Sequence, residues 1–308
     1  MQKVSGSSPV ESWPDKVDSE EKPQSMPLSL HRRFYADEIR VIAGLEDQAL
    51  IRALSTVARE DFLGSPPWRY SSGFSLEAGA YRLTSDCRDL YHDVFVSLKS
   101  NAILNNGQPS IIARLVQALN LRAGMHVMHV GCGTGYYTAI MAHMVGPSGR
   151  VTAVEVDEDL AGQAQANLRE LPHVTVVHAD AANLAPHSLD AVLINAGLTR
   201  IPLAWLNSLA QTGVMVVPML VGVEASSCDA MVFRVERSSQ GFKAAPLTML
   251  TIYPAASLQD ASMRSALSSA CVTRAVLRVQ SLKTADHPAG PGCIAHTTAL
   301  CLSADPPG

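Results

Sequence analysis

The stretch that decides the fold is residues 125–145, MHVMHVGCGTGYYTAIMAHMV. A short β-favouring run ends at Val130, a turn with three glycines (131, 133 and 135) follows, and an apolar helix-like segment starts at Tyr136. A strand, a glycine-rich turn and a helix in this order direct backbone amides and a helix N-terminus at an anionic ligand group. The stretch therefore predicts a binding loop, although three spaced glycines alone also fit an ordinary tight turn.

The same alternation of strand-like and helix-like segments continues downstream of the loop. Such a rhythm predicts parallel strands covered by helices on both faces, a Rossmann-like, doubly wound, mostly parallel α/β sheet. The expected strands are 126–130, 151–156, 174–178, 191–194 and 214–218, and the expected helices are 136–145, 159–170 and 203–210.

The flanking regions differ in composition from this core. Residues 1–30 are rich in Ser, Pro and charged residues without apolar periodicity, which predicts a disordered leader. Residues 31–100 predict an N-terminal segment of two helices, the second at about 47–57, followed by loops from Gly64 to about Arg88. The core spans 101–222 and begins with a helix behind Pro109. We expect 223–308 to be a β-rich extension with strands near 229–236 and 271–282 and a loop at 283–294.

The loop spacing and two acidic residues indicate the type of cofactor. A dinucleotide loop requires a third glycine at position 136, where this chain has Tyr136. Glu155 ends the next strand about twenty residues after the loop, where a carboxylate can accept ribose hydroxyls, and Asp180 follows the third strand. Carboxylates at successive strand ends beside a glycine loop favour an adenosine-bearing ligand.

This constellation resembles the S-adenosylmethionine site of class I methyltransferases. The resemblance implies that Glu155 holds the ribose, that Asp180 lies near the adenine amino group, and that the loop passes the methionine part of S-adenosyl-L-methionine. The loop residues are Gly131, Cys132, Gly133, Thr134 and Gly135.

Over residues 31–222 the chain also resembles the protein-L-isoaspartate O-methyltransferase family. The resemblance implies a carboxyl O-methyltransferase whose partners are peptides or proteins bearing abnormal aspartyl residues. It rests on VAREDFLG at 57–64, Gln108-Pro109 before a helix, the glycine loop, GRVTAVEVDEDLAGQAQANL at 149–168, NAGLTRIP at 195–202 and LAQTGVMVVPMLVG at 209–222.

One departure from the family pattern lies in the acceptor region. Gly107 stands where the family has its active-site Ser, and Asn105 and Asn106 replace a Thr-Ile pair. An acceptor carboxylate is already ionised at neutral pH and needs no general base, so alignment is the main task of the enzyme. We therefore expect Asn105, Asn106 and Gly107 to position the carboxylate, and Gln108 and Thr199 to contact the peptide.

Two alternatives remain open at this point. The missing hydroxyl also fits a related O-methyltransferase that acts on a dedicated peptide Asp or a small metabolite. A non-catalytic module that binds S-adenosylmethionine and a protein partner is the other. His129 lies inside the first core strand, and we interpret it as a core residue rather than a catalytic base.

Composition argues against several other classes. The net charge of −4 argues against nucleic acid as a partner, and no apolar run is long enough to predict a membrane span. The six cysteines are scattered without a Cys-x-x-Cys pair, so we predict reduced thiols and no metal site. With no signal peptide pattern at the N-terminus, the expected location is the cytoplasm.

Overall fold

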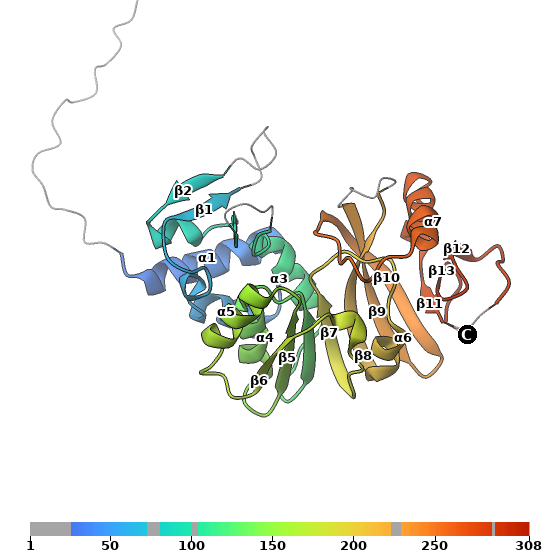
Figure 1. Cartoon of the computed structure of the whole chain (residues 1–308), viewed down its shortest axis with the longest axis horizontal. Coiled ribbons are helices and arrows are strands. Elements are labelled where there is room, and N and C mark those ends of the chain that lie inside the picture. The colour runs from blue at the N-terminus through green and yellow to red at the C-terminus, as the bar shows by residue number, and fades with distance from the viewer. Residues whose placement is uncertain (1–25, 73–80, 100–103, 223–228, 285–286, 308) are drawn as a thin grey trace, which may run out of the picture.

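A computed structural model describes residues 26–72, 81–99, 104–222, 229–284 and 287–307 (Figure 1). Residues 1–25 of the expected leader lie outside the described residues, and helix α1 (Leu28–Ala43) begins within its last three positions. No helix in the described ranges is long and apolar enough to cross a membrane.

One ten-stranded sheet organises the chain, with the strand order β12-β13-β11-β10-β9-β8-β7-β4-β5-β6. Its parallel part confirms the predicted doubly wound sheet, because β4 pairs in parallel with both β5 and β7, and the pairs β5–β6 and β7–β8 are parallel as well. These strands are β4 (His126–Val130), β5 (Arg150–Glu155), β6 (Val174–His178), β7 (Leu189–Ile194) and β8 (Leu209–Leu220).

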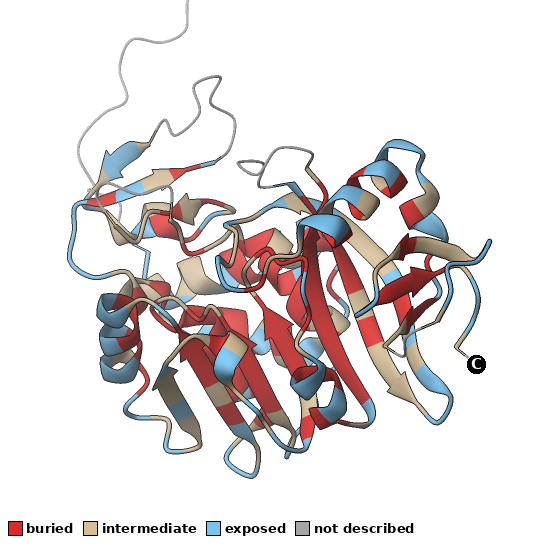
Figure 2. Ribbon diagram, turned by 45° about the vertical axis from the view of Figure 1, so that its right-hand side comes forward, coloured by how far each residue is buried: buried red, intermediate tan, exposed pale blue. Residues whose placement is uncertain are grey.

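Helices cover both faces of the parallel part, and alternate strand residues form two separate cores. On one face, Val127 and Val151 pack in one core with residues of helices α1 to α4. On the other face, Met128 and Val154 pack with residues of α6 and α7. Figure 2 shows the central strands buried and the helices exposed on their outer sides. The remaining covering helices are α2 (Gln48–Thr56), α3 (Pro109–Ala118), α4 (Tyr136–Val145), α5 (Glu158–Asn167), α6 (Leu203–Ser208) and α7 (Ala261–Val272).

The C-terminal region continues the same sheet with antiparallel strands. β9 (Asp229–Ser238) pairs with β8, and β10 (Gly241–Thr251) pairs with β9. The short strands β11 (Ser281–Lys283), β12 (Cys293–His296) and β13 (Cys301–Ser303) complete the far edge. The loop between β10 and α7 thereby returns to the carboxyl ends of the parallel strands.

The strand predicted at 271–282 is wrong. Its first two residues end α7, residues Ala275–Arg278 form a 3₁₀ turn, and only Ser281 and Leu282 lie in a strand. The Asp260 side chain accepts a hydrogen bond from the Met263 amide and caps the start of this helix. The helix predicted to reach residue 210 ends at Ser208, because β8 already starts at Leu209.

The N-terminal segment holds the two expected helices and also a small sheet that the sequence did not predict. Strands β1 (Trp68–Ser71), β2 (Arg82–Thr84) and β3 (Phe95–Val96) pair antiparallel in the order β2-β1-β3. Two 3₁₀ turns, η1 (Arg59–Phe62) and η2 (Cys87–Leu90), precede β1 and β3. This segment carries the chain across the carboxyl ends of the core strands.

Candidate active site

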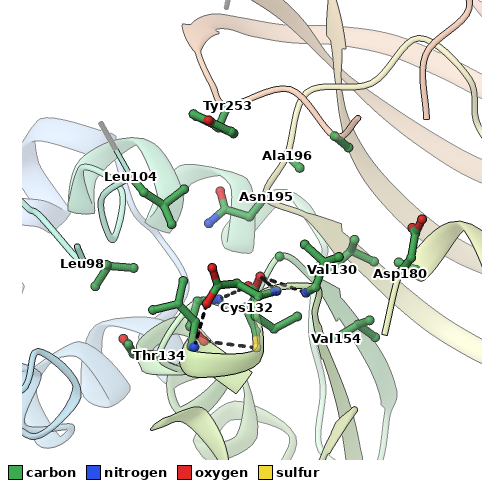
Figure 3. A pocket seen from close by; sticks show the side chains of 18 of the residues that line it. Leu98, Leu104, Val130, Cys132, Thr134, Val154, Asp180, Asn195, Ala196 and Tyr253 are labelled. Atoms are coloured by element: carbon green, nitrogen blue, oxygen red, sulfur yellow. Dashed lines mark hydrogen bonds between the residues drawn. The ribbon is translucent and has the colours of Figure 1, made fainter. Parts of the chain in front are cut away.

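A cavity of about 490 Å³ lies at the carboxyl ends of β4, β5 and β7, within the size range of small-ligand sites. Figure 3 shows residues of the glycine loop below the opening, Leu98 and Leu104 on one side, and Asp180 on the other. Besides the glycine loop and the strand ends, the described residues that line it include 98–99 and 104–106 and the loop 253–258 after β10. The C-terminal region is therefore part of this site.

The glycine loop follows β4 closely and lines the cavity. Gly131 has φ +74°, and a Cβ at this position would lie 3.2 Å from the Asn195 carbonyl oxygen, so a side chain here would be strained and tightly placed. Cys132, Gly133 and Thr134 line the cavity as well. Gly135 instead forms the N-cap of α4, behind the lining residues.

Glu155 is held in place by backbone amides. It is only 7% exposed; its Oε2 accepts a hydrogen bond from the Gly133 amide at 2.8 Å, and its Oε1 accepts bonds from the Val156 and Asp157 amides at 2.9 and 3.1 Å. A carboxylate has about four lone-pair sites, and three are used by these amides. The remaining site on Oε2 fits one ribose hydroxyl, so Glu155 both shapes the glycine loop and offers an acceptor to a nucleoside.

Asp180 follows β6 by two residues and lies at one end of the cavity (Figure 3). Its Oδ1 accepts hydrogen bonds from the Ala182 amide at 2.9 Å and the Ser257 hydroxyl at 2.8 Å. Ser257 belongs to the loop after β10, which thus closes over the position expected for an adenine. On the opposite rim, the Lys99 ammonium bonds to Asp157 and holds the pKa of that carboxyl below its ordinary value.

Asn105 and Asn106 line the cavity at its other end, and each amide oxygen is engaged by the backbone. The Asn105 Oδ1 accepts a hydrogen bond from the Gly107 amide at 2.8 Å. The Gly107 amide is therefore engaged within the turn and does not point at a substrate, contrary to the expectation that Gly107 positions the carboxylate. The Asn106 Oδ1 accepts bonds from the Val96 amide at 2.8 Å and from Arg59 at 3.4 Å. Both of these partners are donors, which fixes the orientation of the amide. The Asn106 Nδ2 is buried without a hydrogen-bond partner among the described residues.

Arg59 is a further residue that shapes this end of the cavity, and the sequence reasoning did not single it out. It is fully buried, and its guanidinium donates hydrogen bonds to the carbonyls of Leu90 and Val94, both at 2.6 Å. The guanidinium also lies 5.9 Å from the ring centre of Tyr136. Arg59 therefore ties the segment before the cavity to α4 and to Asn106. The available signal was its place in the VAREDFLG stretch at 57–64, on which the family resemblance partly rests.

The two predicted peptide contacts, Gln108 and Thr199, lie away from the cavity wall, and Gly107 is not among the described lining residues either. The Gln108 side chain donates to Asp93 at 2.7 Å, and the buried Thr199 hydroxyl accepts a bond from the Asp260 amide at 2.6 Å. Neither is among the residues that line the cavity. His129 is fully buried beside Thr138, and burial lowers its pKa to about 3. The interpretation of His129 as a core residue is confirmed.

Comparison with known proteins agrees with this geometry. The family model for protein-L-isoaspartate(D-aspartate) O-methyltransferase matches residues 75–258. A protein-L-isoaspartate O-methyltransferase from Ignicoccus hospitalis is 32% identical over 150 residues, which cover 47% of this chain and 69% of the relative. A protein-L-isoaspartate O-methyltransferase 2 from Rhodopseudomonas palustris is 30% identical over 232 residues, covering 74% and 89%.

Solved structures show the same fold. A protein-L-isoaspartate O-methyltransferase aligns with a TM-score of 0.61 at 19% identity, covering 89% of this chain and 88% of that one. A Plasmodium falciparum protein assigned to the same family, solved with S-adenosyl-L-homocysteine, aligns with a TM-score of 0.55 at 15% identity, covering 72% and 97%.

The fold and the site at its strand ends define a class I, S-adenosylmethionine-dependent methyltransferase. Within this class, the chain belongs to the protein-L-isoaspartate(D-aspartate) O-methyltransferase family.

Proposed function

We propose that this protein transfers a methyl group to the carboxylate of L-isoaspartyl or D-aspartyl residues in damaged peptides or proteins. Its relatives carry the name of this activity, and one cavity joins the residues expected to hold the cofactor to a polar acceptor end. The observation that carries the proposal is this shared cavity, which is lined by the glycine loop, Glu155 and Asp180 and, at its other end, by Asn105 and Asn106.

The lining of the cavity favours an acceptor that is already deprotonated. Among the described lining residues there is no histidine, and burial raises the pKa of the Cys132 thiol and the Tyr137 hydroxyl above their ordinary values. Both groups are therefore protonated at neutral pH and cannot serve as a general base. An alcohol or amine acceptor needs proton removal, whereas a carboxylate with a pKa near 4 does not.

Bound S-adenosylmethionine supplies a methyl group activated by a sulfonium centre. We expect Glu155 to hold a ribose hydroxyl on Oε2, and Asp180 to lie at the adenine end. The Asn106 Nδ2 then donates to the acceptor carboxylate and orients one of its oxygens toward the methyl carbon. Holding reactants in line in this way can lower a barrier by about 7–11 kcal/mol. This amide takes the part that the resemblance gives to a serine hydroxyl.

Paired peptides test the proposal. The protein is incubated with isotopically labelled S-adenosylmethionine and either an isoaspartyl peptide or its normal aspartyl twin, and base-labile methyl ester is counted. Ester on the isoaspartyl peptide alone is the expected result. Ester on the normal twin alone, or on neither while other carboxylates are methylated, would indicate a related O-methyltransferase with a dedicated acceptor. Cofactor binding without transfer to any carboxylate in a broad peptide pool would indicate a non-catalytic binding module.

A further inference from the structure

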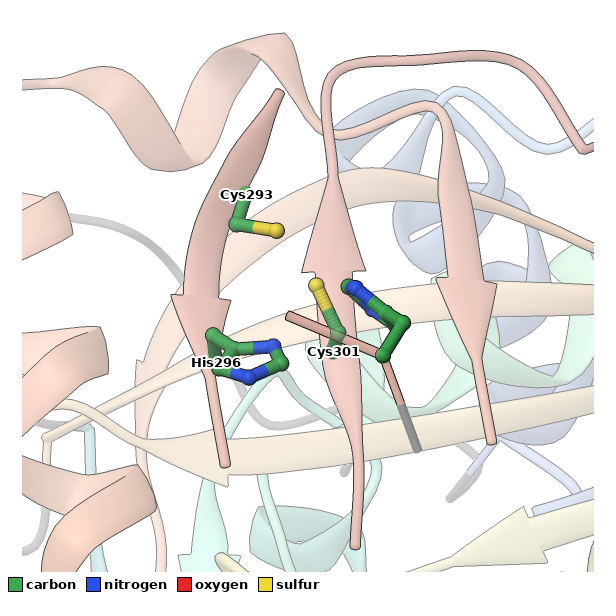
Figure 4. Close-up of side chains that lie close together, drawn as sticks. Cys293, His296 and Cys301 are labelled. Carbon is green, nitrogen blue, oxygen red and sulfur yellow. The ribbon is translucent and has the colours of Figure 1, made fainter. Parts of the chain in front are cut away.

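Four potential metal ligands lie close together at the far edge of the sheet, at strands β12 and β13, away from the cavity. They are His287, Cys293, His296 and Cys301, and one ligand atom from each lies within 4.8 Å of every other. Figure 4 shows Cys293 and His296 on one strand and Cys301 on its neighbour, with their side chains converging. In a zinc tetrahedron, two thiolates at about 2.3 Å from the metal lie about 3.8 Å apart and two imidazole nitrogens at about 2.0–2.1 Å lie about 3.4 Å apart, so no pair of ligand atoms needs to approach by more than about 1.5 Å.

An irregularity in β12 brings the strand ligands to one face. His296 is the direct cross-strand partner of Cys301, and Cys293 is the partner of Ser303, two residues further along β13. Residues three apart in a regular strand point to opposite faces, so Cys293 and His296 would normally diverge. The pairing register shifts between Cys293 and Ala295, and the extra residue restores both side chains to the same face.

The two histidines each present a nitrogen without a partner. The His287 Nε2 and the His296 Nδ1 are buried and have no hydrogen-bond partner among the described residues. The other ring nitrogen of His287, Nδ1, lies 3.0 Å from the Pro288 carbonyl oxygen, to which it can only donate. That bond leaves Nε2 as a bare acceptor, which is the tautomer of a metal-bound imidazole. The rings are 4.7 Å apart between centres.

The surroundings of the sulfur atoms also suit coordination. The Gly290 amide donates to the Cys293 Sγ at 3.3 Å, a contact that a thiolate accepts more strongly than a thiol. A divalent cation favours the thiolate form, and each thiol releases its proton to solvent when it binds.

We propose that His287, Cys293, His296 and Cys301 bind one zinc ion with tetrahedral geometry. Two thiolates and two imidazoles are a typical zinc ligand set, and four protein ligands leave no open position for a substrate. The site is therefore structural: it fastens the loop before β12 to the β12–β13 hairpin at the edge of the sheet. The sequence prediction of scattered thiols without a metal did not anticipate this cluster. The two-residue spacing in Cys293-Ile294-Ala295-His296 was the overlooked signal.

Metal analysis of the full chain tests this site. The protein is purified under reducing conditions without a metal-affinity step, and zinc is measured per chain by mass spectrometry. We expect one zinc per chain in the parent protein and in a Cys271→Ser control, which changes a thiol of the same region outside the cluster. Cys293→Ser and Cys301→Ser should each lose nearly all of it.

Cobalt substitution keeps the test informative if these variants fail to fold. Adding Co²⁺ to the metal-free parent protein should produce the strong visible bands of a tetrahedral site and a thiolate-to-cobalt charge-transfer band, and Zn²⁺ should abolish both. A folded parent chain that shows neither zinc nor these bands would overturn the proposal. Full zinc retention in a Cys293→Ser/Cys301→Ser double variant, or a Cys293–Cys301 disulfide in the reduced preparation, would overturn it as well.

Discussion

Replacing Asn106 with Asp separates the proposed acceptor contact from the folding role of the same side chain. The aspartate keeps an oxygen for the Val96 amide at 2.8 Å and for Arg59 at 3.4 Å, so the local structure should persist. The change removes the Nδ2 donor and places a carboxylate oxygen where the substrate carboxylate is expected. A hydrogen bond to a charged group contributes about 1.5–3 kcal/mol, and its loss alone lowers kcat/KM by about 10- to 150-fold.

Charge repulsion adds to this loss. Two carboxylates about 4 Å apart near a protein surface repel by about 4 kcal/mol, which the neighbouring Arg59 guanidinium partly offsets. We therefore expect kcat/KM for an isoaspartyl peptide to decrease by about 150-fold or more, the largest decrease in that range or beyond it. The affinity for S-adenosyl-L-homocysteine, measured by calorimetry, should stay unchanged, and so should the thermal midpoint. Asn207→Asp makes the same chemical change at an exposed position and should leave all three quantities at the parent values. An Asn106→Asp enzyme with parental kcat/KM would refute the acceptor role.

Four further predictions follow from other contacts. Glu155→Ala should weaken S-adenosyl-L-homocysteine binding by about 10- to 150-fold in calorimetry, because an ionic hydrogen bond to the ribose is lost. Gly107→Ser restores the family's hydroxyl but should lower the free energy of unfolding in urea by at least about 1 kcal/mol, since the residue has φ +79° and its Cβ would lie 2.8 Å from Ile112. Arg59→Met should lower it by about 1–3 kcal/mol for each of the two carbonyls left without their short bonds. Burial lowers the pKa of His129 from 6.5 to about 3, so the unfolded chain takes up a proton that the folded chain refuses. Stability should therefore be full above pH 6.5 and fall as the pH drops toward 3, by about 2 kcal/mol at pH 5, and His129→Gln should remove this part of the pH dependence.

Each of these expectations has an outcome that contradicts it. Unchanged affinity in Glu155→Ala would remove the ribose assignment. A Gly107→Ser protein of parental stability would mean that the turn relaxes around the new side chain. Parental stability in Arg59→Met would mean that the freed carbonyls find other partners. An identical pH dependence in the parent and in His129→Gln would show that other groups account for acid destabilisation.

The core of the fold was predictable because local pattern and tertiary environment agree there. The apolar run before the glycine loop became β4, and the run after it became α4, both at the predicted bounds. Parallel strands buried on both faces have continuous apolar sequences, which stand out without knowledge of neighbours. The N-terminal sheet did not stand out, because β2 and β3 have only three and two residues and depend on their pairing with β1.

That the glycine loop, Glu155 and Asp180 lie together at one cavity was predictable, but their hydrogen bonds were not. The positions of Glu155 and Asp180 follow from strand ends that meet at one edge of a sheet. That three backbone amides occupy Glu155, and that the Gly107 amide turns toward Asn105, depends on the loop conformations. The role of Arg59 depends on carbonyls more than thirty positions away in the chain.

The C-terminal region was the least predictable part. Residues 271–282 alternate like a strand, yet the helix capped by Asp260 extends to Val272. Local alternation over a few residues is weak evidence against a helix that starts well upstream. The Cys293-x-x-His296 spacing hints at the histidine and cysteine cluster, but the bulge in β12 that aligns these two side chains and the contribution of His287 from the preceding loop depend on the fold.

A crystal structure of the protein with S-adenosyl-L-homocysteine and an isoaspartyl peptide tests the central claim most directly. We predict a ribose hydroxyl on the Glu155 Oε2, the adenine beside Asp180, and the isoaspartyl carboxylate within hydrogen-bond distance of the Asn106 Nδ2, with one oxygen facing the sulfur atom. A nucleoside bound away from Glu155, or a peptide carboxylate held by other residues with Asn106 unengaged, would contradict it.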